Sequence, residues 1–336
     1  MKAYELLSVG NLKLQDVPYP TPLADWCVVR VRACGICSSD IPRIFKRGTY
    51  HFPTIPGHEI SGIVDSVCNQ TYRNLVGKRV AVFPLIPCRN CRQCAIHHYE
   101  MCEKYDYIGS RRDGGFSQFV AVPIWNLVFL PDEVSLIQGA ELEPLAVAIH
   151  AVKKCNLTPQ DRLAIIGTGI IALSAAIYAS HVVHCASVTV IGRSETKRHF
   201  VNQLGPIDYF PSALEKSNRF TKVIEAVGSN ESLVSSIDIC ESGGQIVLLG
   251  NPARDNLLKQ NDYWKILRKQ LTLVGSWNSS YPDDWQSALT AFSTPGFNPE
   301  TLVTHLFNAS DLPRGLDLMR SHQEPYIKVM TLWNEK

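Results

Sequence analysis

The chain has 336 residues, of which 45% are hydrophobic, and its formal net charge at pH 7 is +2. A charge this close to balance argues against nucleic acid or an anionic membrane surface as the main partner. The length exceeds what one hydrophobic core usually fills, so two domains are expected. No apolar run reaches the roughly 18 residues of a membrane span, and the start lacks a signal-peptide pattern, so we expect a cytoplasmic protein.

Residues 1–33 alternate apolar and polar side chains between prolines, which predicts short antiparallel strands. A cysteine pair follows, Cys34 and Cys37, and about twenty residues later comes His58, just before a predicted strand over 60–67. The thiolate of Cys37 and the imidazole of His58 can converge on one metal ion. The alternatives are a redox pair for the two cysteines and a hydrogen-bonded core position for the histidine.

A carboxylate completes this candidate metal site, because Glu143 precedes Pro144 in an otherwise apolar run. One Cys, one His and one Glu form the mixed ligand set of a catalytic zinc that keeps a fourth position open. Ser39 lies two residues past Cys37, where its hydroxyl can take a proton from a substrate oxygen and pass it outward. The alternative for Ser39 is a helix N-cap, and we expect Asp40 to hold the local backbone.

Four cysteines then follow at the spacing Cys-x2-Cys-x2-Cys-x7-Cys, which predicts a closed structural zinc site; they are Cys88, Cys91, Cys94 and Cys102. The competing interpretation is an iron–sulfur cluster. Because four thiolates already complete a tetrahedral site, His97 and His98 within this segment are expected to face solvent.

Basic residues flank the metal motifs, and the usual interpretation of such groups is a solvated face. Arg43 follows the Cys37 motif directly, however, so its side chain can point into the site. Paired guanidinium donors match a phosphate monoester. We therefore predict substrate contacts for Arg43, and also for Lys46 and Arg111.

An apolar strand ending near residue 166 runs into a glycine-rich turn that precedes a predicted helix, and the turn reads Gly167-Thr168-Gly169-Ile170-Ile171-Ala172. This is a dinucleotide fingerprint, in which the backbone approaches the pyrophosphate at the helix N-terminus. Later strands end at Val227-Gly228 and at Leu249-Gly250. These four residues are candidates to line the nicotinamide half of the cofactor.

The second strand of this region ends in Gly192, where the fingerprint expects an acidic residue for the ribose hydroxyls. A carboxylate there would repel a 2′-phosphate, whereas glycine makes room for it. Arg193 and Ser194, with Arg198 one turn further on, can bind the phosphate. The sequence therefore favours NADP(H), and NAD(H) remains the alternative if Gly192 is only a permissive turn.

The motifs around Cys37, His58, Cys88 and Glu143 together resemble the zinc-dependent medium-chain dehydrogenases, over essentially the whole chain. The resemblance implies an α/β protein with a GroES-like β domain (1–150 and 280–336) and a doubly wound Rossmann domain (151–279). It implies two zinc ions per chain, one catalytic and one structural, and substrate in a cleft between the domains. It also implies a homodimer that pairs the strand 271–275 with its twin.

The resemblance assigns Cys37, His58 and Glu143 to the catalytic zinc, makes Cys34 a buried small residue and starts the proton relay at Ser39. Glu59 would lie beside the metal, either without binding it directly or exchanging with water as a ligand. A zinc-ribbon binding module would explain only the four cysteines. A zinc-free quinone reductase would explain only the dinucleotide fingerprint.

Within this family the segments 39–46, 105–116 and 274–277 are most similar to the galactitol-1-phosphate 5-dehydrogenases. This similarity implies oxidation of a polyol phosphate to a ketose phosphate. Gly192 departs from the acidic residue that the branch is expected to carry, so an NADPH-dependent ketose-phosphate reductase is one alternative. Other polyols, such as sorbitol or ribitol 5-phosphate, are further alternatives.

Overall fold

A computed structural model describes residues 1–193, 195–212 and 219–333. The chain forms two compact units, Met1–Glu143 with Val303–Lys336, and Pro144–Leu302. We expected the return to the first domain at residue 280, but residues 280–302 belong to the second unit. Residues 144–150, which we also expected in the first domain, belong to the second unit as well. The two segments are bound to each other, because Asp284 of α8 (Asp283–Ala291) accepts a hydrogen bond of 2.8 Å from His150 of α3 (Leu136–Lys154).

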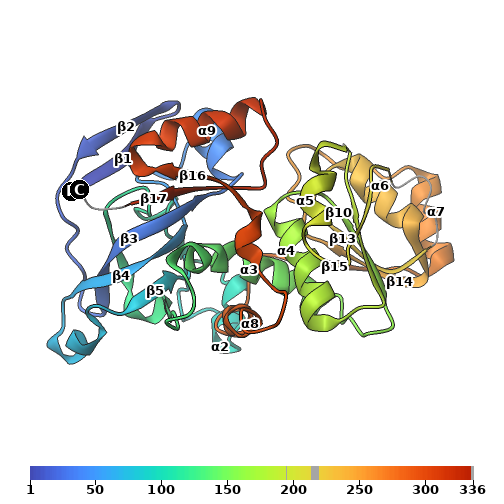
Figure 1. The fold of residues 1–336 in the computed structure, drawn as a ribbon, viewed down its shortest axis with the longest axis horizontal. Coiled ribbons are helices and arrows are strands. Elements are labelled where there is room, and N and C mark those ends of the chain that lie inside the picture. Colours follow the sequence, from blue (N-terminus) through green and yellow to red (C-terminus); the bar gives the residue numbers. More distant parts are fainter. Residues whose placement is uncertain (194, 213–218, 334–336) are drawn as a thin grey trace. The chain divides into compact units, whose positions relative to one another are not determined.

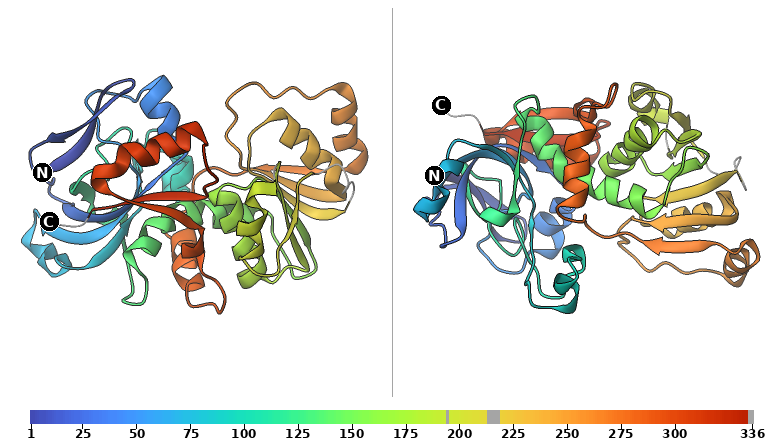
Figure 2. Two further views of the ribbon diagram at one scale, coloured as in Figure 1. Left: turned by 45° about the horizontal axis from the view of Figure 1, so that its top comes forward. Right: turned by 90° about the horizontal axis from the view of Figure 1, so that it is seen from below.

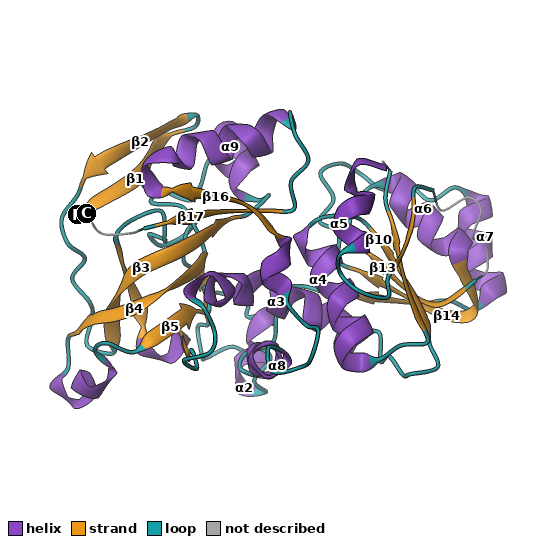
Figure 3. Cartoon of the chain, viewed as in Figure 1, coloured by secondary structure: helices purple, strands orange, loops and turns teal. Residues whose placement is uncertain are grey.

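The first unit is built on a seven-stranded sheet in the order β16-β17-β3-β4-β5-β9, with β8 also paired to β3. The long strand β3 (Trp26–Ile36) runs antiparallel to β4, β8 and β17, while β16 and β17 are parallel. Figure 3 shows the strands of this unit. The remaining strands are β1 (Lys2–Ser8), β2 (Asn11–Asp16), β4 (Glu59–Val67), β5 (Arg79–Val82), β6 (Leu85–Ile86), β7 (Asp106–Tyr107), β8 (Phe119–Pro123), β9 (Leu127–Phe129), β16 (Val303–Asn308) and β17 (Lys328–Leu332).

Alternation of side chains along β3 explains the core of this unit, because Cys27, Val29 and Val31 all point into one buried cluster. Helix α9 (Leu312–Ser321) adds Leu312 and Leu316 to that cluster and lies along β16 and β17 (Figure 2). The short helices are α1 (Asp40–Pro42) and α2 (Arg92–Ala95).

The second unit has a parallel six-stranded sheet in the order β12-β11-β10-β13-β14-β15. Figure 1 shows α4 and α5 on one face of this sheet and α6 and α7 on the other, as in a doubly wound fold. The expected Rossmann architecture is confirmed. Its elements are β10 (Arg162–Ile166), α4 (Ile170–Tyr178), β11 (Ser187–Ile191), α5 (Arg198–Asn202), β12 (Asp208–Phe210), β13 (Phe220–Glu225), α6 (Asn230–Ile239), β14 (Cys240–Leu248), α7 (Gln260–Lys269) and β15 (Thr272–Gly275).

Strand order changes direction at β10, because β11 lies on one side of it and β13 on the other. Ligands of open α/β sheets bind at such a switch point, beyond the carboxyl ends of the strands. Within the described ranges, no helix is both long and apolar enough to cross a membrane.

Candidate active site

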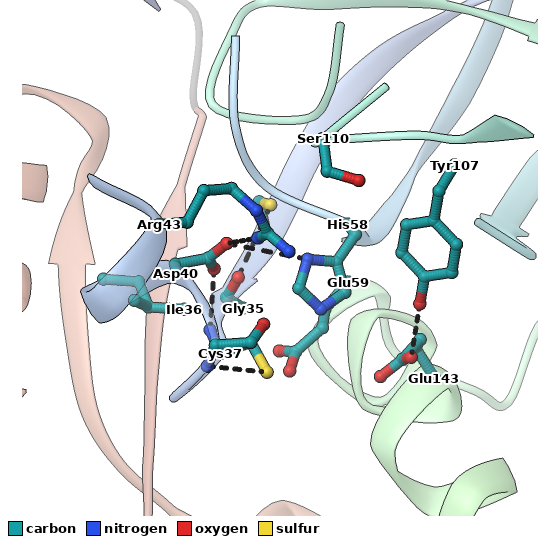
Figure 4. A network of polar contacts seen from close by, with 12 residues as sticks. Gly35, Ile36, Cys37, Asp40, Arg43, His58, Glu59, Tyr107, Ser110 and Glu143 are labelled. Carbon is teal, nitrogen blue, oxygen red and sulfur yellow. Dashed lines mark hydrogen bonds and ion pairs between the residues drawn. The ribbon is translucent and has the colours of Figure 1, made fainter. Parts of the chain in front are cut away.

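Three predicted site residues meet in the first unit, where the ligand atoms of Cys37, His58 and Glu59 all lie within 4.8 Å of one another. Antiparallel pairing of β3 with β4 explains the meeting, since Gly35 near the end of β3 lies opposite Glu59 at the start of β4. His58 and Glu59 are only 4% and 1% exposed. Side chains separated by twenty residues of sequence thus become one buried group (Figure 4).

The backbone before His58 is held by a second chain segment. Gly57 has a φ of +95°, which favours glycine, and its carbonyl accepts a hydrogen bond of 2.9 Å from the amide of Gly115. A Cβ on Gly114 would lie 2.1 Å from the same carbonyl oxygen. The glycines of the 105–116 segment therefore allow it to pack directly against the turn that presents His58.

Asp40 connects the cysteine and histidine segments. Its carboxylate is fully buried and accepts hydrogen bonds from the Cys37 amide at 3.0 Å and from the Arg43 guanidinium at 2.7 Å. The Nδ1 atom of His58 lies 3.7 Å from the same carboxylate. This separation is longer than a hydrogen bond, so the carboxylate acts on the ring through its negative charge. Asp40 thus does more than the expected backbone contact.

Lys328 is a site residue that we did not identify from the sequence. It is 1% exposed, forms an ion pair with Glu59 and donates a hydrogen bond of 3.1 Å to the carbonyl of Ile36. A Cβ on Gly35 would lie 1.8 Å from Glu59 Oε2 and 2.7 Å from Lys328 Cε. Glycine at this position therefore leaves the space that the ion pair occupies. The available signal was a lysine inside the apolar run Tyr326–Leu332.

Glu143 lies near this group without belonging to it. Its carboxylate on α3 is buried, and the hydroxyl of Tyr107 donates to it at 3.4 Å. The Tyr107 ring meets the His58 ring edge-on, with 5.7 Å between centroids. Figure 4 shows the His58 ring between the Asp40–Arg43 pair and the Tyr107–Glu143 pair. The structure thus joins Glu59, rather than Glu143, directly to Cys37 and His58.

The charges of this group and of the neighbouring Glu143 fit a cation. Burial raises the pKa of Glu143 to about 8, and His58 opposes this shift while Glu59 and Cys37 add to it. Burial and the negative charges of Glu59 and Asp40 also raise the pKa of the Cys37 thiol. Acidic groups that ionise reluctantly in the metal-free protein indicate a site that lacks positive charge. Sulfur, nitrogen and oxygen donors of this kind match zinc.

Ser39 is exposed and occupies the N-cap position of α1, but its side chain makes no capping hydrogen bond. Its amide instead points to the Cys37 sulfur at 3.5 Å. The alternative role of helix cap is therefore not realised by the Ser39 side chain.

The three basic candidates have different surroundings. Arg43 is bound to Asp40 at the edge of the metal group. Lys46 is exposed on the turn Arg43–Arg47. The guanidinium of Arg111 lies 4.4 Å from the ring centroids of both Tyr50 and Tyr105. The structure therefore brings only Arg43 to the residues around His58.

The four cysteines of the predicted structural site come together as expected from their spacing. The ligand atoms of Cys88, Cys91, Cys94 and Cys102 lie within 4.8 Å of one another. Backbone hydrogen bonds from Glu103 and Cys94 lower the pKa of Cys91 to about 6, whereas burial raises the pKa of Cys94 to about 12. The set offers four sulfurs to one closed tetrahedral site. His97 and His98 are exposed and contact Tyr99 and Glu100 instead.

The second unit contains a cavity of about 470 Å³ at the switch point of its sheet. Gly167, Gly169, Gly192, Arg193 and Val227 are among the residues that line it. The turn between β10 and α4 contributes the first two, and the N-terminal residues of that helix are Ile170 and Ile171. Predicted cofactor residues from three strand ends thus surround one space.

The structure explains the glycine at position 192 by a close contact that the sequence did not show. A Cβ there would lie 2.3 Å from the hydroxyl oxygen of Tyr209 and 2.8 Å from Thr168 Cγ2. Arg198 is bound to Glu195 at 2.9 Å and lies over the Tyr209 ring, whereas Arg193 lines the cavity. Ser194 lies outside the described residues.

Both units of the chain match known protein families. Residues 23–132 match the family described as alcohol dehydrogenase GroES-like domain, and residues 167–294 match the family described as zinc-binding dehydrogenase. Galactitol 1-phosphate 5-dehydrogenase of Escherichia coli is 34% identical over 291 residues, which cover 82% of this chain and 84% of that protein.

Solved structures agree with these matches. The crystal structure of galactitol-1-phosphate dehydrogenase from Escherichia coli superimposes with a TM-score of 0.91 at 30% identity, covering 99% of this chain and 100% of the other. A zinc-binding dehydrogenase from Sinorhizobium meliloti 1021, bound to NADP, has a TM-score of 0.89 at 26% identity, with 99% of each chain covered.

Proposed function

The chain belongs to the zinc-dependent medium-chain alcohol dehydrogenase family, and from this premise we propose that it oxidises a secondary alcohol of a polyol phosphate. The substrate is of the galactitol 1-phosphate type, the product is the ketose phosphate, and a nicotinamide cofactor accepts the hydride. One observation carries the proposal: the guanidinium of Arg43 is held by Asp40 beside the Cys37–His58 group. Identity of 34% to galactitol 1-phosphate 5-dehydrogenase supports the substrate class.

Cys37, His58 and Glu143 are the proposed protein ligands of the catalytic zinc. Electrostatics favours Glu143 as the third ligand, because Lys328 already compensates the charge of Glu59. The raised pKa of Glu143 indicates a carboxyl group that becomes an anion readily only when a cation arrives. Glu59 is then a neighbour of the metal that Lys328 holds in place.

Zinc at this site would act as a Lewis acid toward the substrate oxygen. The remaining roles in catalysis belong to residues of the chain. Ser39 takes the proton of the substrate hydroxyl and passes it outward. Asp40 places a negative charge beside the His58 ring, and Tyr107 positions Glu143 through its hydroxyl. Hydride transfer itself is the chemistry of the nicotinamide cofactor.

A second, structural zinc is proposed at Cys88, Cys91, Cys94 and Cys102. Four sulfur donors within 4.8 Å of one another support it, since such a site leaves no position open for substrate. The chain would then bind two zinc ions.

NADP(H) is the favoured cofactor, with NAD(H) as the alternative. Arg193 in the cavity wall supports this preference, as does the related zinc-binding dehydrogenase from Sinorhizobium meliloti 1021 that is bound to NADP. Gly192 supports it less than the sequence indicated, because Tyr209 and Thr168 already occupy the space that a Cβ there would need. An NADPH-dependent enzyme would also suit the reduction of a ketose phosphate.

We propose a homodimer that forms at β15. This strand is at the edge of the parallel sheet. Exposed apolar side chains lie on it and on the segments next to it in sequence, and they include Leu273, Trp277 and, on α7, Trp264 and Leu267. An exposed edge with such a patch is typical of a protein interface. Light scattering of Leu267→Glu should give the mass of a monomer if this surface forms the dimer.

The test is a set of initial rates for purified, zinc-loaded protein with galactitol 1-phosphate and with free galactitol, each with NADP and with NAD. We expect turnover with the phosphate ester and little with the free polyol. Arg43→Met should remove this difference, while Arg47→Met, an exposed residue of the same turn, should not. Equal rates with both substrates would direct the search to free polyols such as sorbitol, and turnover only with another ester, such as ribitol 5-phosphate, would replace the substrate.

A further inference from the structure

Glu225 is a buried acidic residue, 3% exposed, at the carboxyl end of β13. It is neither a metal ligand nor a residue that the sequence patterns singled out. A carboxylate at this depth is costly unless hydrogen bonds compensate it, so its partners are informative.

Its partners are the backbones of two loops. The side-chain oxygen Oε1 accepts hydrogen bonds from the amides of Val227 at 2.8 Å and Gly228 at 2.9 Å. The main-chain carbonyl of Glu225 accepts from the amides of Leu249 and Gly250, each at 2.9 Å. One residue therefore binds both the loop that follows β13 and the loop that follows β14.

The two loops are also in direct contact, and no space is left between them for a side chain at either of two glycines. A Cβ on Gly250 would lie 2.0 Å from the amide nitrogen of Gly228 and 2.6 Å from Glu225 Oε2. Gly228 has a φ of +77°, and a Cβ on it would meet the backbone of Asn251 at 2.7 Å. The two glycines thus allow the loops to close around the carboxylate.

The position of these loops connects them to the cofactor. They follow adjacent parallel strands at the carboxyl edge of the sheet, and Val227 lines the cavity that also contains Gly167, Gly169 and Arg193. A dinucleotide bound with its pyrophosphate at the Gly167–Gly169 turn and its adenosine ribose near Arg193 would extend its other half over β13 and β14.

We infer that Glu225 is a positioning residue for the nicotinamide half of the cofactor, through the two loops that its side chain and carbonyl hold. This inference rests on the proposed function as a nicotinamide-dependent enzyme. A carboxylate suits the role because hydrogen bonds to an ionised acceptor are roughly twice as strong as neutral ones. It also brings no N–H group that would need its own acceptor in the tight space between the loops.

The experiment compares two ligands that share the adenosine end. NADPH contains the nicotinamide half, whereas 2′,5′-ADP lacks it. Binding of NADPH by fluorescence titration and of 2′,5′-ADP by calorimetry is measured for the full-length zinc-loaded protein and its variants. For Glu225→Ala we expect NADPH affinity to fall about tenfold or more, with 2′,5′-ADP affinity within about twofold of the parent.

Two further variants separate positioning from general damage. Glu225→Gln keeps one acceptor oxygen, so its NADPH affinity should fall between those of the parent and Glu225→Ala. Glu241→Ala removes the same charge near the start of β14, where Glu241 pairs with Arg162, and should leave both affinities unchanged.

Equal weakening of both ligands in the two Glu225 variants would overturn the inference, because it would assign Glu225 a role in supporting the whole unit. Unchanged NADPH affinity in Glu225→Gln and Glu225→Ala would also overturn it. If the parent protein binds neither ligand, the same comparison is made with NADH and ADP, which lack the 2′-phosphate. Binding of none of the four ligands would mean that the proposed function itself fails, and the inference fails with it.

Discussion

Lys328 and Glu59 form an ion pair in the interior of the first unit, where each side chain is 1% exposed. Burial alone lowers the pKa of the Lys328 ammonium, but the negative charges of Glu59 and Cys37 raise it overall. The pair joins the first residue of β17 to the first residue of β4, next to the proposed catalytic zinc ligands. Its position makes Lys328 the compensating charge for the Glu59 carboxylate, which lies beside Cys37 and His58.

Replacement of Lys328 by Met should be strongly destabilising, because the Glu59 carboxylate would remain buried without its partner. We expect a loss of about 3–5 kcal/mol in the free energy of unfolding, measured by urea denaturation. The double variant Lys328→Met with Glu59→Leu should recover most of the loss, since it removes both charges. A single variant within about 1 kcal/mol of the parent would show that Glu59 does not depend on Lys328.

Metal analysis separates the two candidate carboxylate ligands. Glu143→Gln should reduce the zinc content from two ions per chain to one, because a neutral amide is a poor replacement for an ionised ligand. Glu59→Gln combined with Lys328→Met should retain two, because this variant leaves the charge at residue 143 in place. The opposite pattern, measured by plasma mass spectrometry, would make Glu59 the third ligand.

The stability of the metal-free protein should depend on pH through Glu143. The pKa of this group rises from 4.5 to about 8 on folding, so the native state binds its proton more tightly than the unfolded state does. The free energy of unfolding should therefore fall as the pH rises from about 4.5 to about 8. Urea denaturation of chelator-treated protein at pH 5.5 and 7.5 measures this slope.

Glu143→Gln supplies the control for that measurement, because an amide does not titrate. The variant should lose most of the difference in stability between the two pH values. A parent protein that becomes more stable over this range would contradict the assignment.

The four-cysteine site should depend on each of its thiolates. Cys91→Ala should remove one zinc per chain and lower stability, because three sulfurs cannot complete the closed tetrahedral site. Cys68→Ala is a matched control, since Cys68 is exposed and belongs to neither metal group. Loss of both zinc ions in Cys91→Ala would indicate that the two sites are coupled.

Cofactor choice should depend on Arg193 rather than on the absence of a side chain at residue 192. Arg193→Asp should lower the ratio of NADP to NAD efficiency, because the new carboxylate repels a 2′-phosphate. Gly192→Ala should lower the melting temperature through the clash with Tyr209 and change that ratio little. An unchanged ratio in Arg193→Asp would contradict the argument for NADP.

Local patterns in the sequence predicted the four-cysteine metal site and the dinucleotide-binding fold. The cysteine spacing from Cys88 to Cys102 indicates a closed metal site, because ligands this close in sequence need only a short loop to meet. The glycine-rich turn after residue 166 indicates a dinucleotide fold, because its backbone conformation depends on neighbouring residues. Short-range signals of this kind are independent of the rest of the structure.

Contacts between residues that are distant in sequence depend on the tertiary structure. Lys328 reaches a carbonyl 292 positions earlier in the sequence, and Glu225 joins two loops separated by a helix and a strand. Gly192 is required by Tyr209, a residue of the next strand, and residues 280–302 belong to the second unit through Asp284. These relationships arise from packing, which brings side chains together irrespective of their spacing, so no local pattern in the chain contains them.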